Sequence, residues 1–342
     1  MRHRIGHSWS TTAVAERPRP VPETMRAALI DGTGSAEVFR IGSIPTPDRV
    51  NAEYLVKVVA AGVNPIDAKT RAGRGVSGAI PAYPTALGFD FSGIVVQAPF
   101  EASELQPGDE VYGVTSFPRT LGSYAEYVVV SSLGLAKKPT TLSHVEAGGV
   151  PLAALTAWGM VVDVAKAHEG QRILIHAGSG GVGHFAVQFA SYFGAQVVTT
   201  GSTQNLPWLR ELGASQVVDH TATRFEDVVR QVDVVIDLVG NTIDDTGTRS
   251  LSILRPGGLI VNAPTGTWPS FLDDTQDAGV RATTYKVAPD GGTLDTITRL
   301  LESGDVRVFV DEVFDLEDVA DAHAALERGH TRGKLVVKVA EG

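Results

Sequence analysis

One stretch near the middle of the chain constrains the fold most. A β-branched apolar run, residues 173–175, stops at a glycine-rich turn, and an amphipathic pattern begins at once at His184. Gly178, Gly180 and Gly183 fit the spacing G-x-G-x-x-G: the first permits a sharp turn, the second lets backbone approach a pyrophosphate, and the third lets a helix pack on the strand. This pattern predicts a dinucleotide bound at a helix N-terminus; the alternative is a glycine-rich turn that binds nothing. The expected contacts are the consecutive residues of the turn, Gly178, Ser179, Gly180, Gly181, Val182 and Gly183.

Composition excludes several classes of protein. The net charge of −10 leaves no basic field to track nucleic-acid phosphates, so we expect no nucleic-acid partner. The chain has no cysteine, which excludes disulfides, thiolate catalysis and cysteine-ligated zinc, and fits a reducing, cytoplasmic location. The longest uncharged stretch, residues 147–162, is too short to span a bilayer and is interrupted by Pro151, so we expect a buried helix and no membrane partner.

The order of patterns predicts two domains in an α/β protein. Residues 1–24 are rich in arginine and lack apolar periodicity, which favours a disordered tail over a transit peptide. Short strands broken by turns predict a β-rich domain over residues 25–145, and residues 288–342 are expected to return to it. Residues 146–287 then form an inserted, doubly wound parallel sheet of the Rossmann type. It is expected to open with a helix at 144–167 and to contain strands at 172–176, 196–200, 215–219, 233–237 and 258–262, with a helix at 242–254.

The second strand of this sheet bears on the choice of dinucleotide. An acidic residue usually follows it and binds the ribose 2′-OH of NAD, but here Ser202, Thr203 and Gln204 follow. These uncharged groups do not repel a 2′-phosphate, and His220, after the third strand, is expected to help neutralise it, so the sequence favours NADPH. The alternative is that Ser202 and Thr203 only cap the next helix. Residues at the carboxyl ends of the fourth and fifth strands are expected at the nicotinamide edge: Leu238, Val239 and Ala263.

Several further segments appear in an order that resembles one protein family. The chain is similar to the medium-chain dehydrogenase/reductase superfamily, in its zinc-free quinone oxidoreductase (zeta-crystallin-like) branch. The resemblance implies a GroES-like domain, formed by residues 25–145 and 288–342, an inserted NADPH-binding Rossmann domain, and a homodimer. The segments that carry it are AAGVNPID (60–67), LGFDFSG (87–93), PGDEV (107–111), PLAALTAW (151–158), AGSGGVG (177–183), LGA (212–214) and LRPGG (254–258).

The residues that replace metal ligands predict the reaction class. Zinc-containing relatives place Cys at the position of Asn64 and a His-Glu pair at Phe89-Asp90, so we expect no metal here. Without a metal, hydride transfer suits acceptors that delocalise charge themselves, such as a quinone or an α,β-unsaturated carbonyl. The open alternatives are an enone or alkenal double-bond reductase, and a non-catalytic NADPH-binding regulatory or crystallin-like protein.

The resemblance implies roles for Asn64 and Thr156, and the chemistry of the residues themselves suggests roles for Lys69 and Lys334. Asn64 is expected to line the cleft beside the nicotinamide, Thr156 to touch the nicotinamide, and Lys69 to orient or protonate an acceptor oxygen. Lys334, which opens the last strand, is expected to reach a coenzyme phosphate. The alternatives are a turn residue for Asn64, a helix-interior threonine for Thr156 and solvated side chains for both lysines. Asp67 and Asp90 are expected to hold loops through hydrogen bonds.

Overall fold

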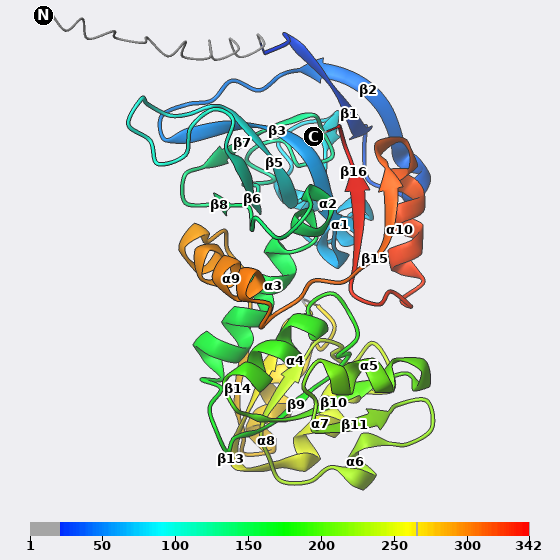
Figure 1. The fold of residues 1–342 in the computed structure, drawn as a ribbon. Helices are drawn as coiled ribbons and strands as arrows, with labels where there is room; N and C mark the ends of the chain where they lie inside the picture. The colour runs from blue at the N-terminus through cyan, green and yellow to red at the C-terminus, as the bar shows by residue number, and fades with distance from the viewer. Residues whose placement is uncertain (1–20, 265, 342) are drawn as a thin grey trace, which may run out of the picture.

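The structure, a computed structural model, describes residues 21–264 and 266–341 (Figure 1). The tail expected over residues 1–24 lies outside this range up to residue 20. Described structure begins before Met25, because the Glu23 carbonyl accepts a hydrogen bond from the Thr46 N–H (3.0 Å) and the first strand starts at Thr24. No described helix is long and apolar enough to cross a membrane.

The GroES-like domain contains two mainly antiparallel sheets. One has the order β2-β1-β4, and the other β15-β16-β3-β5-β6-β8, with β7 also paired to β3. The long strand β3 is almost entirely buried at the centre of this domain, which explains its nearly continuous apolar sequence. The elements are β1 (Thr24–Ile30), β2 (Phe39–Pro45), β3 (Glu53–Val63), α1 (Pro65–Arg71), β4 (Thr85–Ala86), β5 (Asp90–Gln97), β6 (Glu110–Val114), β7 (Tyr127–Ser131), β8 (Leu135–Lys137), α2 (His144–Gly148), β15 (Val310–Asp315), α10 (Val319–Glu327) and β16 (Lys334–Lys338).

The C-terminal part of the chain returns to this first domain. Strand β16 runs antiparallel to β3, with Leu335 opposite Val63, and β15 continues the same sheet on the other side of β16. Figure 1 shows these red and orange strands beside the blue β3, far from the yellow strands that precede them in sequence. The nucleotide-binding sheet is therefore inserted between two segments of one β domain.

The inserted domain is a six-stranded parallel sheet of order β11-β10-β9-β12-β13-β14. The order reverses between β9 and β12, which is the position where such sheets bind ligands outside the carboxyl ends of their strands. Its elements, with the connecting helix α9, are α3 (Pro151–Trp158), β9 (Arg172–Ile175), α4 (Gly183–Tyr192), β10 (Gln196–Gly201), α5 (Leu206–Glu211), β11 (Gln216–Asp219), α6 (Phe225–Val228), β12 (Val232–Asp237), α7 (Thr246–Ser250), β13 (Leu254–Asn262), α8 (Phe271–Asp277), β14 (Arg281–Thr284) and α9 (Gly291–Ser303).

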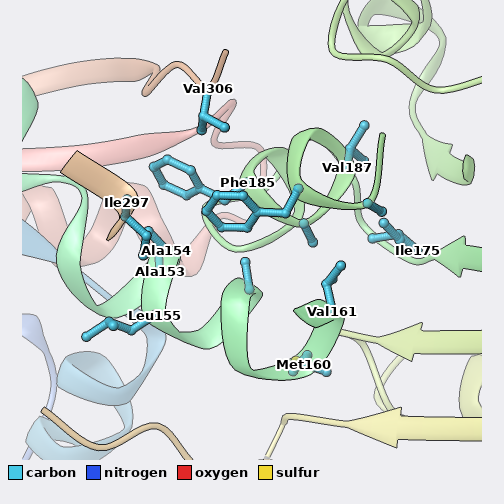
Figure 2. Packing of buried hydrophobic residues seen from close by; sticks show 14 of the residues in the cluster. Ala153, Ala154, Leu155, Met160, Val161, Ile175, Phe185, Val187, Ile297 and Val306 are labelled. Carbon is cyan, nitrogen blue, oxygen red and sulfur yellow. The ribbon is translucent and has the colours of Figure 1, made fainter. Parts of the chain in front are cut away.

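The largest hydrophobic core lies where α3, α4 and α9 meet. Figure 2 shows Phe185 of α4 in the same cluster as Ala154 of α3 and Ile297 of α9, and all three are fully buried. The small side chains of α3 let the aromatic ring of α4 approach closely. Asp290 caps α9 by accepting from the Thr293 N–H (3.0 Å), and Gly304, with φ of 80°, ends the helix.

The expected helix over 144–167 is wrong as a continuous element. It divides into α2, α3 and a wider π-helical turn over Gly159–Val164. Gly148 and Gly149 end α2, and Pro151, which has no N–H, occupies the first turn of α3. A Cβ atom at Gly159 would lie 1.8 Å from the Tyr285 hydroxyl, so the turn after α3 also requires a glycine in the present packing.

The expected helix over 242–254 is also too long. Only Thr246–Ser250 is α-helical, a 3₁₀ turn follows, and β13 already begins at Leu254. Pairing of Leu254 with Val232 of β12 draws these residues into the sheet and overrides their helical pattern.

Phe185→Ala should lower the free energy of unfolding by about 3–5 kcal/mol, because it leaves a cavity in the core between α3, α4 and α9. Tyr192→Ala, on the same helix but 50% exposed, should change it by less than about 1 kcal/mol. Chemical denaturation of both variants checks this, and equal losses would contradict the assigned core.

Candidate functional site

The glycine-rich turn joins β9 to α4 and is closely packed at two of its three motif glycines. A Cβ atom at Gly178 would lie 2.0 Å from Thr199 Oγ1, and one at Gly183 would lie 2.1 Å from the Ala177 carbonyl oxygen. At Gly180 the nearest neighbour is that same carbonyl oxygen, at an ordinary 3.4 Å. Internal packing therefore explains the first and third glycines. The second leaves room beside the N-terminus of α4, where a pyrophosphate fits.

The same turn is contacted by the C-terminal segment of the GroES-like domain. The Gly333 N–H donates a hydrogen bond to the Ser179 carbonyl oxygen (2.9 Å). The Lys334 side chain passes the turn, since its Cδ would lie 3.1 Å from a Cβ atom at Gly181. Val182 is the N-cap residue of α4, which begins at Gly183. The turn thus lies at the junction of the two domains.

Two further strand ends meet beside this turn. Asp237 ends β12 opposite Asn262 of β13, and its buried carboxylate accepts from the Val239 and Gly240 N–H groups (2.9 and 2.8 Å) and from Asn262 Nδ2 (2.7 Å). These bonds hold Leu238, Val239 and Ala263, all half-buried, at the carboxyl edge of the sheet. The sequence indicated those three residues but not Asp237. The pattern that could have revealed it is an acidic residue at the end of an apolar strand.

The segment after β10 lies beside a carboxylate, Asp219 at the end of β11, that the sequence did not reveal. Thr203 and Gln204 are exposed, and Ser202 Oγ accepts from Asn205 Nδ2 (3.2 Å). Thr203 Oγ1 donates to Asp219 Oδ2 (2.5 Å), so its hydrogen points at a carboxylate rather than toward an incoming phosphate. His220 is exposed, and its N–H bonds the Gly201 carbonyl (3.2 Å). The expected hydroxyl-rich site is present, but Asp219 shares it.

The candidate catalytic residue Asn64 lies in a buried polar cluster. It caps α1, its N–H donates to Asp67 Oδ2 (2.8 Å), and its Nδ2 donates to Asp90 Oδ2 (2.8 Å). Its amide oxygen accepts from Lys334 Nζ. The Asn64 side chain is 2% exposed, so both ends of its amide are occupied inside the protein. Its expected contact with nicotinamide ribose or acceptor stays a prediction, and it requires a shift of these partners.

Lys334 is buried in the same polar cluster. It is 3% exposed, and Nζ bonds Asn64 Oδ1, the Val63 carbonyl (3.3 Å) and Asp90 Oδ2 (3.4 Å). The expected alternative of a solvated lysine is therefore wrong, because β16 lies inside the sheet and buries this side chain. Contact between Lys334 and a coenzyme phosphate stays a prediction, supported by the passage of its stem along the glycine turn.

Thr156 and Lys69 differ in their surroundings. Thr156, on α3, donates its hydroxyl hydrogen to the Leu152 carbonyl (2.6 Å), which leaves the oxygen able only to accept. Lys69, on α1, is half-buried, and burial, with a contribution from Arg74, lowers the pKa of its ammonium group. A lowered pKa makes an ammonium group a readier proton donor.

The two carboxylates of this cluster hold backbone, as expected. Asp90 Oδ1 accepts from the Leu152 N–H at the start of α3 (2.6 Å), and Asp67 accepts from Asn64. Burial raises the pKa of Asp90, and the Lys334 ammonium acts against that rise. Burial also raises the pKa of Asp67 to about 7, and the hydrogen bond from the Asn64 N–H only partly opposes this rise.

The positions that resemblance gives to metal ligands hold other chemistry. Phe89 packs against Phe117, with ring centroids 5.4 Å apart, and the Asp90 carboxylate already faces the Lys334 ammonium. A cation placed here would meet that ammonium. Within the part of the chain that the structure describes, no three His, Cys, Asp or Glu side chains form a group that could hold a metal.

Comparisons with known proteins agree with this architecture. The chain matches the family described as alcohol dehydrogenase GroES-like domain over residues 50–140, and the family described as zinc-binding dehydrogenase over residues 212–337. It is similar to 2-methylene-furan-3-one reductase of Solanum lycopersicum (35% identical over 93% of this chain and 80% of the relative). It is equally similar to the chloroplastic NADPH-dependent alkenal/one oxidoreductase of Arabidopsis thaliana (35%, 93% and 80%). Among solved structures, the quinone oxidoreductase from Coxiella burnetii superposes with a TM-score of 0.87, at 36% identity over 93% of this chain and all of that one.

Gly183→Ala should destabilise the protein by about 1–3 kcal/mol and abolish coenzyme binding, because the new methyl group collides with backbone. Gly180→Ala has room for its methyl group inside the protein, so the free energy of unfolding should change by less than about 0.5 kcal/mol. That methyl group occupies the space assigned to pyrophosphate, and NAD(P)H binding should weaken about tenfold, or ~1.4 kcal/mol. Denaturation and fluorescence titration check both variants. Unchanged NAD(P)H binding in Gly180→Ala would contradict the assigned site.

Asp67→Asn should make stability less dependent on pH. The folded-state pKa of Asp67 lies above that of an unfolded chain, so its stabilising contribution is complete near pH 4 and is lost as pH rises through 7. Wild-type protein should lose at most ~1.4 kcal/mol per pH unit from this group between pH 5 and 7, and the variant none of it. Asp31→Asn is the control, because Arg40 lowers the pKa of that exposed carboxyl and places its titration below this range. Parallel curves for wild type and Asp67→Asn would refute the assignment.

Proposed function

Because the chain belongs to the medium-chain dehydrogenase/reductase superfamily, in its quinone oxidoreductase-like branch, and is an NAD(P)H oxidoreductase of small molecules, we propose that it reduces a quinone or an α,β-unsaturated carbonyl with NADPH and without zinc. One observation carries the zinc-free part. The carboxylate at the position of a family metal ligand, Asp90, is bound by Asn64 and by the Lys334 ammonium. The Lys334 ammonium therefore provides the positive charge beside Asp90 that a zinc ion would otherwise provide.

The geometry favours acceptors that need little help with developing charge. NADPH, when bound, supplies a hydride at its nicotinamide ring. The protein orients the two reactants: the glycine turn holds the phosphates, and the strand ends at Leu238, Val239 and Ala263 support the nicotinamide edge. We propose that Thr156, whose oxygen can accept, holds the nicotinamide carboxamide. Lys69 is the proposed proton donor to the reduced acceptor, which its lowered pKa supports, and water is the alternative donor.

Two observations support NADPH over NADH. The segment after β10 contains no acid, and the Arabidopsis relative is described as NADPH-dependent. Ser202, Gln204 and His220 are the residues proposed to meet the 2′-phosphate. Thr203 contributes less than its sequence position indicates, because its hydroxyl is bonded to Asp219.

The second candidate function, reduction of an enone or alkenal double bond, is favoured by the descriptions of the two plant relatives. Both reactions use the same hydride site and differ in the acceptor. We further propose a cytoplasmic homodimer. The absence of cysteine supports the location. For the dimer, β14 is an edge strand of the parallel sheet with no partner on its outer side among the described strands, and Leu272 of the adjacent α8 is 71% exposed.

Oxidation of NADPH by purified protein should proceed with quinones, enones or alkenals, and should be negligible with saturated aldehydes. A strong chelator should leave the rate unchanged, since no metal takes part. Gly183→Ala, which removes the coenzyme site, serves as the inactive control. Tight NADPH binding without turnover of any acceptor would favour a non-catalytic role, and loss of activity with the chelator would contradict zinc independence.

A further inference from the structure

The second strand of the nucleotide-binding sheet, β10, is not followed by an acidic residue in the sequence. A carboxylate from the neighbouring strand β11 nevertheless lies beside its end. Strand β11 pairs parallel to β10, and Asp219 stands opposite Gly201, the last residue of β10. The Asp219 carboxylate accepts from Thr203 Oγ1 (2.5 Å), from the Thr221 N–H (2.9 Å) and from Thr221 Oγ1 (2.6 Å). Pairing with β10 therefore brings an acid from the third strand to the place that the second strand leaves uncharged.

The group at the end of the second strand determines whether NADH or NADPH binds more tightly. In Rossmann sheets the group at the end of the second strand meets the adenosine ribose, where NADH carries a 2′-OH and NADPH a 2′-phosphate. The hydrogen bonds from Thr203 and Thr221 lower the pKa of Asp219, so the group is ionised at neutral pH. A carboxylate accepts a hydrogen bond from a 2′-OH and repels a phosphate.

The surrounding charges do little to offset this repulsion. His220 follows directly and is exposed. Arg224, the next basic residue in the chain, is paired with Glu226 (Nε to Oε1, 2.8 Å). Thr203 is also prevented from donating to a phosphate, because its hydrogen is directed at Asp219.

We propose that Asp219 is the specificity-determining residue that keeps the preference for NADPH over NADH small in this protein. The inference rests on the proposed function only in that the coenzyme occupies the glycine turn. In this proposal Asp219 does more than hold Thr203 and Thr221 through hydrogen bonds. Its carboxylate faces the adenosine ribose and sets the ratio of the affinities for NADPH and NADH.

The test is the dissociation constant of each coenzyme, measured by fluorescence titration without any acceptor. Asp219→Asn keeps an oxygen acceptor for Thr203 and Thr221 but removes the charge. It should raise the selectivity for NADPH over NADH about fivefold, mainly by tighter NADPH binding, and the gain should shrink as ionic strength rises. Asp219→Ser, which also removes the charge, is the second variant and should shift selectivity in the same direction even if the segment loosens.

Glu211→Gln is the matched control, because it removes one negative charge at the far end of α5. It should leave the selectivity unchanged. An equal change in affinity for both coenzymes in Asp219→Asn, or the same gain in Glu211→Gln, would overturn the inference and leave Asp219 a structural residue. Because no acceptor is present, absence of turnover would count against the proposed reaction and not against this result. Failure of wild-type protein to bind either coenzyme would overturn both.

Discussion

A single buried ammonium group, Lys334 Nζ, joins the parts of the molecule that have to act together. A buried charge requires partners, and here the partners are Asn64, Asp90 and the Val63 carbonyl, all from the GroES-like domain. Asp90 in turn accepts from the first turn of α3, and the stem of Lys334 lies along the glycine turn. Removing the ammonium group would leave Asp90 buried without its charged partner, so the junction between the domains depends on it.

Two buried carboxylates, one in each domain, hold the strand and helix ends that surround the candidate site. Asp237 fixes the ends of β12 and β13, while Asp90 fixes the start of α3 and the cap of α1. Both are fully buried, and their hydrogen bonds come from backbone and amide groups and, for Asp90, also from the Lys334 ammonium. Neither is therefore positioned as an acid or base for a substrate. Their effect is to hold strand and helix ends in place, which is preorganisation of the kind that a hydride transfer requires.

Local patterns predicted the parts of the structure that depend on neighbouring residues. The glycine turn and the alternation of strands and helices were evident from spacing, whereas the return of the last strand was expected with support from the family resemblance. The helix expected over 144–167 is divided at Gly148, Gly149 and Pro151, which are local signals. The need for glycine at position 159 could not be predicted, because it comes from packing against Tyr285, which is distant in sequence. Asp219 and Lys334 could not be placed for the same reason: the first reaches its position through pairing of β11 with β10, and the second through pairing of β16 with β3.

The insertion of one domain within the other has a consequence for how the chain is made. All six strands of the parallel sheet lie between residues 172 and 284, so this domain has its complete sheet while the C-terminal residues are still being added. The GroES-like sheet lacks β16, the neighbour of its central strand β3, until residues 334–338 have been synthesised. During synthesis the coenzyme domain can therefore complete its sheet first, and the edge of β3 stays uncovered until the end.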